Sequence, residues 1–313
     1  MKDELHLVLG AAGVSGLAVL EELKKRGLKS RAVIRQKSLE GYECVRADLL
    51  DSHQAEVVIR EATHVYVCVG ITYSTSVWER EWPILIQNVV RACEISESKL
   101  IFLDNIYMYG PSPLLVPFDE THSRSPSSKK GKVRKEVANI VWNAMTHNRI
   151  KAIIGRAADF YGPKVKNSAL YPAFIENFLL NKTPQSIAPL RVRHTYAYVP
   201  DLGRALVDLS QEESCYGDIW HLPVGDPITI EELSILLNKI LSTDLKVSHL
   251  PTFMRKILSL FISPLGELDE MMYQFNSDYV MSFEKFKKKF PKFRTTGYEE
   301  GLKATIQSFK NNG

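Results

Sequence analysis

Three glycines between an apolar run and an amphipathic stretch are the first residues whose types and spacing could do chemistry. The segment from Gly10 to Gly16 has the pattern G-x-x-G-x-x-G. Glycine permits a tight turn and close approach of a pyrophosphate, and the following helix N-terminus supplies N–H donors and positive potential. A plain strand-to-helix turn would rarely need three glycines at this spacing. The segment therefore predicts dinucleotide binding by Gly10, Ala12, Gly13, Val14, Ser15 and Gly16.

The end of the second apolar run, residues 30–34, indicates which dinucleotide binds. A NAD site usually places an acid there to bind the ribose 2′-hydroxyl. This chain has Arg35 instead, followed by Lys37. A guanidinium suits a 2′-phosphate, so we expect NADP, with NAD as the less favoured alternative. The competing interpretation of Arg35 is a strand-end arginine in water, and Arg31 is expected on the solvent side of the strand.

Short apolar runs alternate with longer amphipathic stretches through the first half of the chain. This alternation predicts a parallel sheet covered by helices on both faces, an α/β, doubly wound Rossmann fold. A loop is expected over 121–132. The expected strands are 5–9, 30–34, 44–47, 65–69, 100–103 and 152–154. One expected helix follows the glycine turn and ends near residue 26, and two others span 77–95 and 133–146.

The alternation loosens after Gly162-Pro163, where a smaller, mostly helical substrate lobe is expected. The predicted Rossmann domain comprises residues 1–165 plus about 194–225. The predicted lobe comprises about 166–193 and 226–313. Helices are expected in the second half at 169–180, 231–241, 253–261 and 298–309.

Composition excludes several classes of protein. Hydrophobic residues make up 45% and charged residues 24% of 313, which is typical of a globular chain. The net charge of +4 is too small to require nucleic acid, and the apolar runs are too short to span a bilayer. We therefore expect a small-molecule substrate, no nucleic-acid or membrane partner, and a homodimer as one assembly to test.

The four cysteines are not arranged as a metal site. Cys44, Cys68, Cys93 and Cys215 form no C-x-x-C motif, and no histidine accompanies them at zinc-ligand spacing. We expect free thiols and no metal. Because the first residues lead directly into an apolar strand without a secretory pattern, we expect a cytoplasmic protein.

Besides the glycine turn, further segments occur along the chain in a known order. They are Ala47-Asp48-Leu49, Cys68-Val69-Gly70, Asn88, Tyr109-Gly110-Pro111, residues 156–163 and residues 194–201. With these segments the chain resembles the extended short-chain dehydrogenase/reductase superfamily, in its NAD-dependent epimerase/dehydratase branch, over nearly its whole length. The resemblance implies that Asp48 and Leu49 contact adenine, that Cys68, Val69 and Gly70 lie under the cofactor, and that Asn88 belongs to the same site.

The catalytic positions depart from that family, which uses a Ser or Thr and a Tyr-x-x-x-Lys pair. None of the thirteen tyrosines has a lysine four residues later. Asn105 stands at the Ser/Thr position, and the segment 130–136 places Lys130 at the tyrosine and Arg134 at the lysine. The chain therefore resembles an atypical subgroup.

Two cations, Arg134 on the expected helix and Lys130 in the loop just before it, are the first candidates for catalysis, and they lie one helical turn apart if the helix begins early enough to include Lys130. Arg134 could bind ribose hydroxyls or a phosphate, but its guanidinium cannot serve as an acid. Lys130 could transfer a proton if burial and a nearby cation weakened its hold on it. The alternative for Lys130 is a solvated basic helix start, because Lys129, Lys132 and Lys135 crowd the same stretch.

Four other side chains are candidates for the missing groups or for contact with substrate. Asn105 could orient a substrate carbonyl, or it could satisfy backbone groups at a strand end. Tyr107 could supply the acid. Asp159, where the family has asparagine, could act as a base or hold a turn, and His194 could contact substrate or only a polar neighbour.

The expected function is hydride transfer between nicotinamide and a carbon of a small polar substrate. A carbonyl or hydroxyl compound is expected, with sugars and nucleotide sugars among the classes, and reduction, epimerisation and dehydration all stay open. The alternative is a catalytically degenerate NADP-binding sensor or regulatory protein, because all three usual catalytic residue types are replaced.

Overall fold

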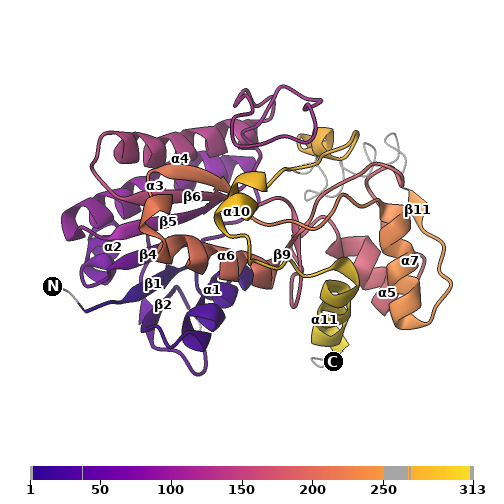
Figure 1. Cartoon of the computed structure of the whole chain (residues 1–313), viewed down its shortest axis with the longest axis horizontal. Helices are drawn as coiled ribbons and strands as arrows, with labels where there is room; N and C mark the ends of the chain where they lie inside the picture. The colour runs from indigo at the N-terminus through magenta and orange to yellow at the C-terminus, as the bar shows by residue number, and fades with distance from the viewer. Residues whose placement is uncertain (1–2, 37, 250–266, 268, 311–313) are drawn as a thin grey trace. The chain divides into compact units, whose positions relative to one another are not determined.

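The apolar runs of the first half form one parallel sheet together with a strand from the second half, shown in Figure 1. The computed structural model describes residues 3–36, 38–249, 267 and 269–310. The strand order is β10-β6-β5-β4-β1-β2-β3, so the winding direction reverses between β1 and β4. This order confirms the predicted doubly wound α/β Rossmann fold. The strands are β1 (His6–Leu9), β2 (Ser30–Ile34), β3 (Cys44–Arg46), β4 (His64–Val67), β5 (Lys99–Asp104), β6 (Ala152–Arg156) and β10 (Asp218–His221).

Helices bury the sheet because its strands are apolar on both faces. Helices α2, α3 and α4 share one hydrophobic core with the sheet. Helix α6 packs closely on α1, since a Cβ on Gly203 would lie 2.5 Å from the Ala18 carbonyl oxygen. The α-helices are α1 (Val14–Lys25), α2 (Ser52–Ile59), α3 (Thr75–Ser96), α4 (Lys129–Thr146) and α6 (Val199–Gln211), and a short 3₁₀ turn spans Glu213–Cys215.

Contacts divide the described residues into two compact units. Unit 1 holds those of Met1–Met108, Lys129–Ala157 and Leu202–Leu222, and unit 2 holds those of Tyr109–Ser128, Ala158–Asp201 and Pro223–Gly313. These limits differ from the domain boundaries expected from the sequence, which stay a prediction.

Unit 2 has its own hydrophobic core, built mainly by α7 and α11 and the helical turns near Phe174. A capping box starts α7, because Thr229 accepts from the Glu232 backbone while the Glu232 carboxylate accepts from Thr229. The elements of unit 2 are β7 (Phe160–Tyr161), η1 (Tyr171–Ile175), α5 (Glu176–Leu179), β8 (Gln185–Ser186), β9 (Ala197–Tyr198), α7 (Ile230–Leu241), β11 (Ser248–His249), η3 (Met272–Gln274), α10 (Glu284–Lys289) and α11 (Tyr298–Lys310).

Some expected elements differ from those in the structure. The expected helix over 169–180 is interrupted, because Pro172 and Ala173 have non-helical backbone angles. The expected loop over 121–132 ends sooner, since α4 begins at Lys129. The expected helix over 253–261 lies outside the described residues. Among the described residues, no helix combines the length and apolar composition needed to cross a membrane.

The four cysteines all belong to unit 1 and are free thiols. Cys68, Cys93 and Cys215 are buried, whereas Cys44 is half-buried. Burial raises the pKa of the Cys68 thiol to about 12.

Candidate functional site

The glycine turn follows β1, and nearby backbone atoms leave no room for a side chain at Gly10 or Gly16. Gly10 has a φ of +73°, in the left-handed region that favours glycine. A Cβ on Gly10 would lie 2.6 Å from the Cα of Val69, and a Cβ on Gly16 would lie 2.5 Å from the Gly10 oxygen. The nearest atom to a Cβ on Gly13 would be the Gly10 oxygen at 3.3 Å. The fold therefore needs Gly10 and Gly16, whereas a Cβ on Gly13 would make a single, less severe close contact.

Helix α1 begins in this turn, and the N–H groups of its first turn point out of its N-terminal end. Gly13 is the N-cap residue, and no side chain of the described residues caps it. First-turn N–H groups lack partners within their helix and carry the positive end of its dipole. Of the other predicted ligands here, Ala12 is exposed, Val14 is half-buried and Ser15 is buried. This uncapped helix start fits the phosphates of a dinucleotide.

The end of β2 leaves one described cation exposed. Arg35 follows the strand directly and is exposed to solvent. Arg31 instead donates to Glu43 at 2.6 Å and to Glu61 at 3.2 Å, as expected for the solvent side of the strand. Lys37 lies outside the described residues. Arg35 is thus the described side chain that the NADP prediction depends on.

The turn after β3 is fixed from helix α3. The Asp48 carboxylate accepts from the Leu50 N–H at 3.1 Å, and Asp48 is exposed while Leu49 is buried. Asn88 donates its amide to the carbonyls of Leu49 at 3.0 Å and Leu50 at 3.1 Å. Asn88 therefore holds the backbone of this turn, and its predicted contact with a cofactor stays a prediction.

The segment after β4 lies beside the glycine turn. Cys68 donates its N–H to Leu9 at 2.9 Å, which continues the pairing with β1. Val69 packs against the core, and Gly70 has open space where a Cβ would be. The backbone of Cys68 and Val69 thus lies close to Gly10, and the expected position of Cys68, Val69 and Gly70 near a cofactor stays a prediction.

Lys130 is buried at the start of α4. Its Nζ donates to the Thr75 hydroxyl at 2.9 Å and lies 4.7 Å from the centre of the Tyr73 ring. Lysine is almost never fully buried unless it is paired. Lys129 and Lys132 are exposed, but the solvated helix start considered for Lys130 is wrong, because none of its surface is accessible.

Tyr107 belongs to the same group of side chains as Lys130. Tyr73 contacts Trp78 edge to face at 5.5 Å, and Trp78 stacks on Tyr107 at 6.2 Å between ring centres. We call Tyr73, Trp78 and Tyr107 the aromatic cluster. Lys130 contacts one end of it, and the half-buried Tyr107 forms the other.

Arg134, one helical turn after Lys130, has different partners. Its Nε donates to Asp104 Oδ1 at 3.0 Å, and its Nη2 contacts the same oxygen. Arg156 Nε lies 3.6 Å from the other oxygen of Asp104, and the Arg134 guanidinium covers the Trp82 ring at 4.3 Å. All three charged side chains are buried. Arg134 therefore stabilises the end of β5, and its predicted contact with a cofactor or substrate stays a prediction.

Asn105 follows β5 and holds a turn. Its Oδ1 accepts from the Tyr107 N–H at 3.1 Å, which is the geometry of an Asx turn. This bond matches the backbone role considered for Asn105, and a role toward a substrate carbonyl stays a prediction.

The candidate Asp159 belongs to unit 2, whereas the other four catalytic candidates belong to unit 1. Its carboxylate lies 3.3 Å from His194 Nε2. The His194 ring is buried and stacks on Phe275 at 5.2 Å and on Tyr279 at 5.4 Å. Asp159 therefore orients a packed histidine, and its role as a base stays a prediction.

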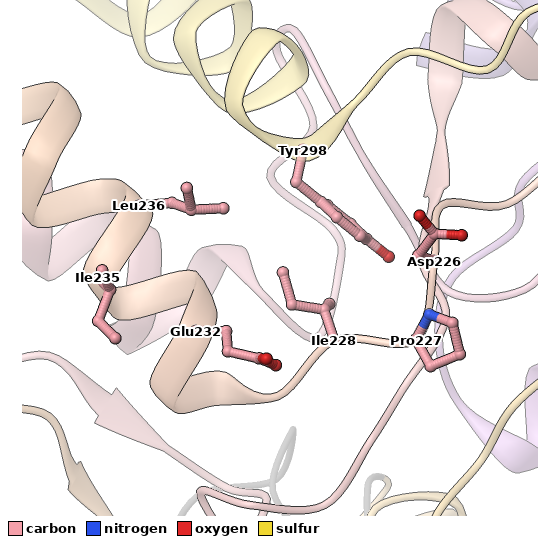
Figure 2. A pocket seen from close by; sticks show the side chains of 7 residues that line it. All are labelled: Asp226, Pro227, Ile228, Glu232, Ile235, Leu236 and Tyr298. Carbon is pink, nitrogen blue, oxygen red and sulfur yellow. The ribbon is translucent and has the colours of Figure 1, made fainter.

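Unit 2 also has a shallow groove along α7, shown in Figure 2. None of the residues predicted to form a site lines it. The Glu232 carboxylate in its wall accepts from the Thr229 N–H at 2.8 Å, so it serves the helix cap. The lining residues are Asp226, Pro227, Ile228, Glu232, Ile235, Leu236 and Tyr298.

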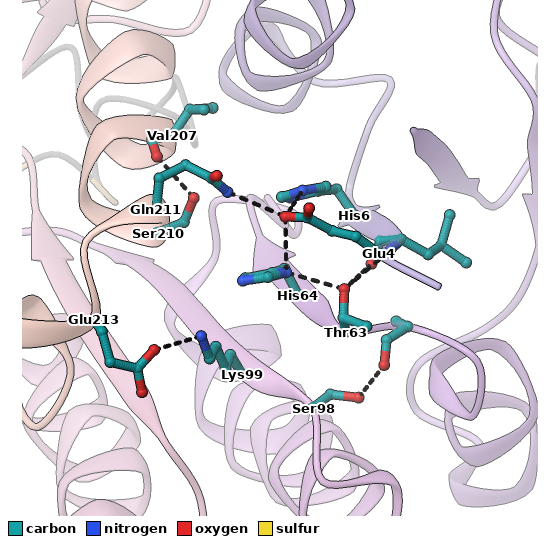
Figure 3. Close-up of polar contacts among 12 residues, drawn as sticks. Glu4, His6, Thr63, His64, Ser98, Lys99, Val207, Ser210, Gln211 and Glu213 are labelled. Atoms are coloured by element: carbon teal, nitrogen blue, oxygen red, sulfur yellow. Dashed lines mark hydrogen bonds and ion pairs between the residues drawn. The ribbon is translucent and has the colours of Figure 1, made fainter. Parts of the chain in front are cut away.

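One polar cluster was missed in the sequence. His6 and His64 occupy paired positions of β1 and β4, and Glu4 precedes His6 by two residues. Residues i and i+2 of an extended chain share a face, so the Glu-x-His spacing was a usable signal. The three side chains bring one potential ligand atom each within 4.8 Å of one another (Figure 3).

Comparison with known families identifies the chain's relatives. The model of the NAD dependent epimerase/dehydratase family matches residues 6–220. Among curated protein sequences, none matches this chain.

Solved structures share the fold over almost the whole chain. A UDP-glucose 4-epimerase of Thermotoga maritima, crystallised with UDP-glucose, is 20% identical and has a TM-score of 0.80, covering 98% of this chain and 99% of that one. A UDP-glucuronic acid 4-epimerase of Bacillus cereus, in complex with NAD, is 17% identical with a TM-score of 0.79 and coverages of 98% and 99%. An epimerase of Methanothermobacter thermautotrophicus is 15% identical with a TM-score of 0.82, covering 99% of this chain and 93% of that one.

Proposed function

The chain belongs to the NAD-dependent epimerase/dehydratase family, and from this premise we propose an enzyme that transfers hydride to or from a small polar substrate. The reacting carbon carries a hydroxyl or carbonyl group. Sugars and nucleotide sugars are the first substrates to test, because two structures with this fold are epimerases of UDP-sugars. The whole-chain likeness to them supports the fold of such an enzyme.

The glycine turn and helix α1 hold the cofactor in this proposal. The nicotinamide, when bound, accepts or donates the hydride. The first-turn N–H groups of α1 bind the pyrophosphate, while Asp48 and Leu49 lie at the adenine. Arg35 binds a 2′-phosphate, which makes NADP the proposed cofactor. NAD, the cofactor of the Bacillus cereus structure, is the alternative.

The burial of Lys130 is the observation that carries the catalytic part of the proposal. Its ammonium is removed from water and held by the Thr75 hydroxyl and the Tyr73 ring. A preorganised charge in a dry environment stabilises a developing oxyanion far better than one in water. In this proposal the buried charge of Lys130 stabilises the substrate oxygen through its electric field rather than by contact, as the carbon gains or loses hydride, and Tyr107 is the next candidate to move the proton.

The test compares two neighbouring lysines. Nucleotide sugars and reducible carbonyls are screened for turnover, and each hit is repeated with Lys130→Met and Lys129→Met. Lys130→Met should lower turnover by at least ~100-fold, about 2.7 kcal/mol of transition-state stabilisation. Lys129→Met should leave turnover unchanged, because Lys129 is exposed. Normal turnover in a folded Lys130→Met variant would disprove the catalytic assignment.

A second candidate function is supported by Arg134. Its guanidinium is paired with Asp104, so the position that the family gives to a catalytic lysine serves the fold. A catalytically degenerate sensor of NADP(H), as a homodimer in the cytoplasm, is the alternative proposal. Absence of any turnover, together with partner binding that changes with NADP(H), would favour it.

A further inference from the structure

Tyr73 is the accessible side chain beside the buried ammonium of Lys130. None of the surface of Lys130 is accessible, whereas Tyr73 is 39% exposed. The Lys130 Nζ lies 4.7 Å from the centre of the Tyr73 ring, so the ring covers the ammonium on one side. A substrate therefore cannot touch the ammonium, but it can touch the exposed part of the side chain that covers it.

Neighbouring side chains hold both partners of this contact in place. Thr75, the first residue of α3, accepts a hydrogen bond from Lys130 Nζ at 2.9 Å. Trp78, on the same helix, contacts the Tyr73 ring edge to face at 5.5 Å. Aromatic pairs prefer such defined orientations. Tyr73 and Lys130 therefore meet in a fixed geometry.

Tyr73 belongs to the edge of the sheet where this type of fold binds its ligands. Strand β4 ends at Val67, and Tyr73 lies in the segment that joins this strand to α3. Open α/β sheets bind ligands beyond the carboxyl ends of the strands, at the point where the winding reverses, which here lies between β1 and β4. The glycine turn follows β1, which pairs in parallel with β4. Tyr73 and the proposed cofactor site thus share this edge.

A phenol beside a buried cation is suited to moving a proton. The ammonium stabilises the negative charge that develops on the phenol when its proton leaves, and burial strengthens this attraction because little water screens it. The exposed part of Tyr73 contacts solvent, which can restore the proton. Tyr107, the earlier candidate, lies at the other end of the aromatic cluster, with Trp78 between it and Tyr73.

We propose that Tyr73 is the catalytic residue that transfers the proton, an inference that rests on the proposed hydride transfer. In the reducing direction a carbonyl carbon gains hydride from the bound nicotinamide, and the electron pair of its π bond moves to the oxygen. That oxygen takes the proton of the Tyr73 hydroxyl, and the phenolate left behind regains a proton from water. Oxidation of an alcohol runs the same steps in reverse. Lys130 stabilises the phenolate, and Thr75 is the positioning residue that holds Lys130.

The first experiment needs neither substrate nor cofactor. The full chain is treated at neutral pH with N-acetylimidazole, which acetylates the ionised phenol, and each tyrosine is followed by peptide mass spectrometry. Tyr73 should react at least ~10-fold faster in the parent chain than in Lys130→Met, because the variant lacks the charge that stabilises the phenolate. Tyr42, whose ring is contacted by Lys24 instead, is the internal reference and should react alike in both chains. Equal rates at Tyr73 would overturn the proposal.

The second experiment uses any compound that the parent chain turns over. Tyr73→Phe removes only the hydroxyl and keeps the ring over Lys130, so the variant should fold. It should lower kcat by at least ~100-fold, the lower end of what a positioned acid or base contributes, and leave KM nearly unchanged. Tyr107→Phe is the matched control and should leave kcat nearly unchanged. Thermal unfolding shows whether each variant is folded.

The outcomes separate this inference from the proposed function. Normal kcat in Tyr73→Phe, together with a loss in Lys130→Met, would overturn the role of Tyr73 and leave the enzymatic proposal standing. An equal loss in Tyr73→Phe and Tyr107→Phe would also overturn it. Absence of turnover by the parent chain would count against the proposed function, and the acetylation rates would then decide whether Lys130 activates Tyr73.

Discussion

The glycine turn after β1 and the start of helix α4 build their sites from different atoms. The turn uses backbone: Gly10 needs a left-handed conformation, and α1 offers N–H groups. The start of α4 uses side chains, Lys130 and Arg134, whose partners lie on distant segments of the chain. A site made of backbone depends on residue types that can be read directly from the sequence. A site made of long side chains depends on what the fold packs beside them.

Removal of Arg134 should have the largest effect, and it tests whether this part of α4 is structural. Arg134→Met leaves the Asp104 carboxylate buried with only Arg156 at 3.6 Å. Loss of one partner of a buried ion pair costs about 3–5 kcal/mol of unfolding free energy. Urea denaturation measures it. Arg149→Met, which breaks an exposed pair with Glu94, is the control and should cost far less. Equal costs would show that Arg134 does not hold β5.

A branched side chain at Gly13 should separate binding from folding in the glycine turn. A Cβ there would make a tight contact of 3.3 Å with the Gly10 oxygen, looser than the contacts at Gly10 and Gly16, so Gly13→Val should disturb the turn less than the same change at those two positions. Its side chain would fill the approach to the uncapped helix start and weaken dinucleotide binding by at least ~100-fold, about 2.7 kcal/mol. Calorimetry with NADP and NAD measures this, and thermal unfolding checks the fold. Unchanged binding in the folded variant would place the cofactor elsewhere.

Charge reversal at Arg35 sharpens the comparison, because Arg35 is a side chain proposed to bind the same cofactor as the backbone of the glycine turn. Arg35→Asp should reverse the cofactor preference. It should weaken the binding of NADP by ~10-fold and strengthen the binding of NAD by ~10-fold. Calorimetric affinities of the parent chain should favour NADP. Tighter binding of NAD by the parent chain would contradict the assignment and make NAD the cofactor.

Asn88 should show the smallest effect. Asn88→Ala removes two hydrogen bonds to the carbonyls of Leu49 and Leu50 and should cost about 1–2 kcal/mol of unfolding free energy. Asn143→Ala, at an exposed position of α4, is the control. A large loss of cofactor affinity without loss of stability would instead favour direct contact of Asn88 with the cofactor.

The same distinction explains what could be predicted from the sequence. The apolar runs predicted the positions of the central strands. The strand expected over 65–69 begins one residue earlier and ends two residues earlier, at His64–Val67. Helix α2 was not predicted, yet Asp51 caps it by accepting from Gln54, a recognisable N-cap spacing.

The surroundings of the charged residues could not be predicted in this way. Lys129, Lys130 and Lys132 look alike in the sequence, and only the fold brings Thr75 and Tyr73 to Lys130. The pairing of Arg134 with Asp104 likewise joins residues thirty positions apart in the chain. The cluster of Glu4, His6 and His64 was visible only in part, because the pairing of β1 with β4 brings His64 to it.

The buried thiols of unit 1 make its internal motions chemically measurable. Alkylating reagents attack the thiolate, and Cys68 has a pKa of about 12, so its side chain is almost entirely protonated at neutral pH. Cys93 and Cys215 are also buried, whereas Cys44 is half-buried. Fast labelling should therefore stop after Cys44. The slow labelling of the other three would report how often their segments open, with no probe added to the chain.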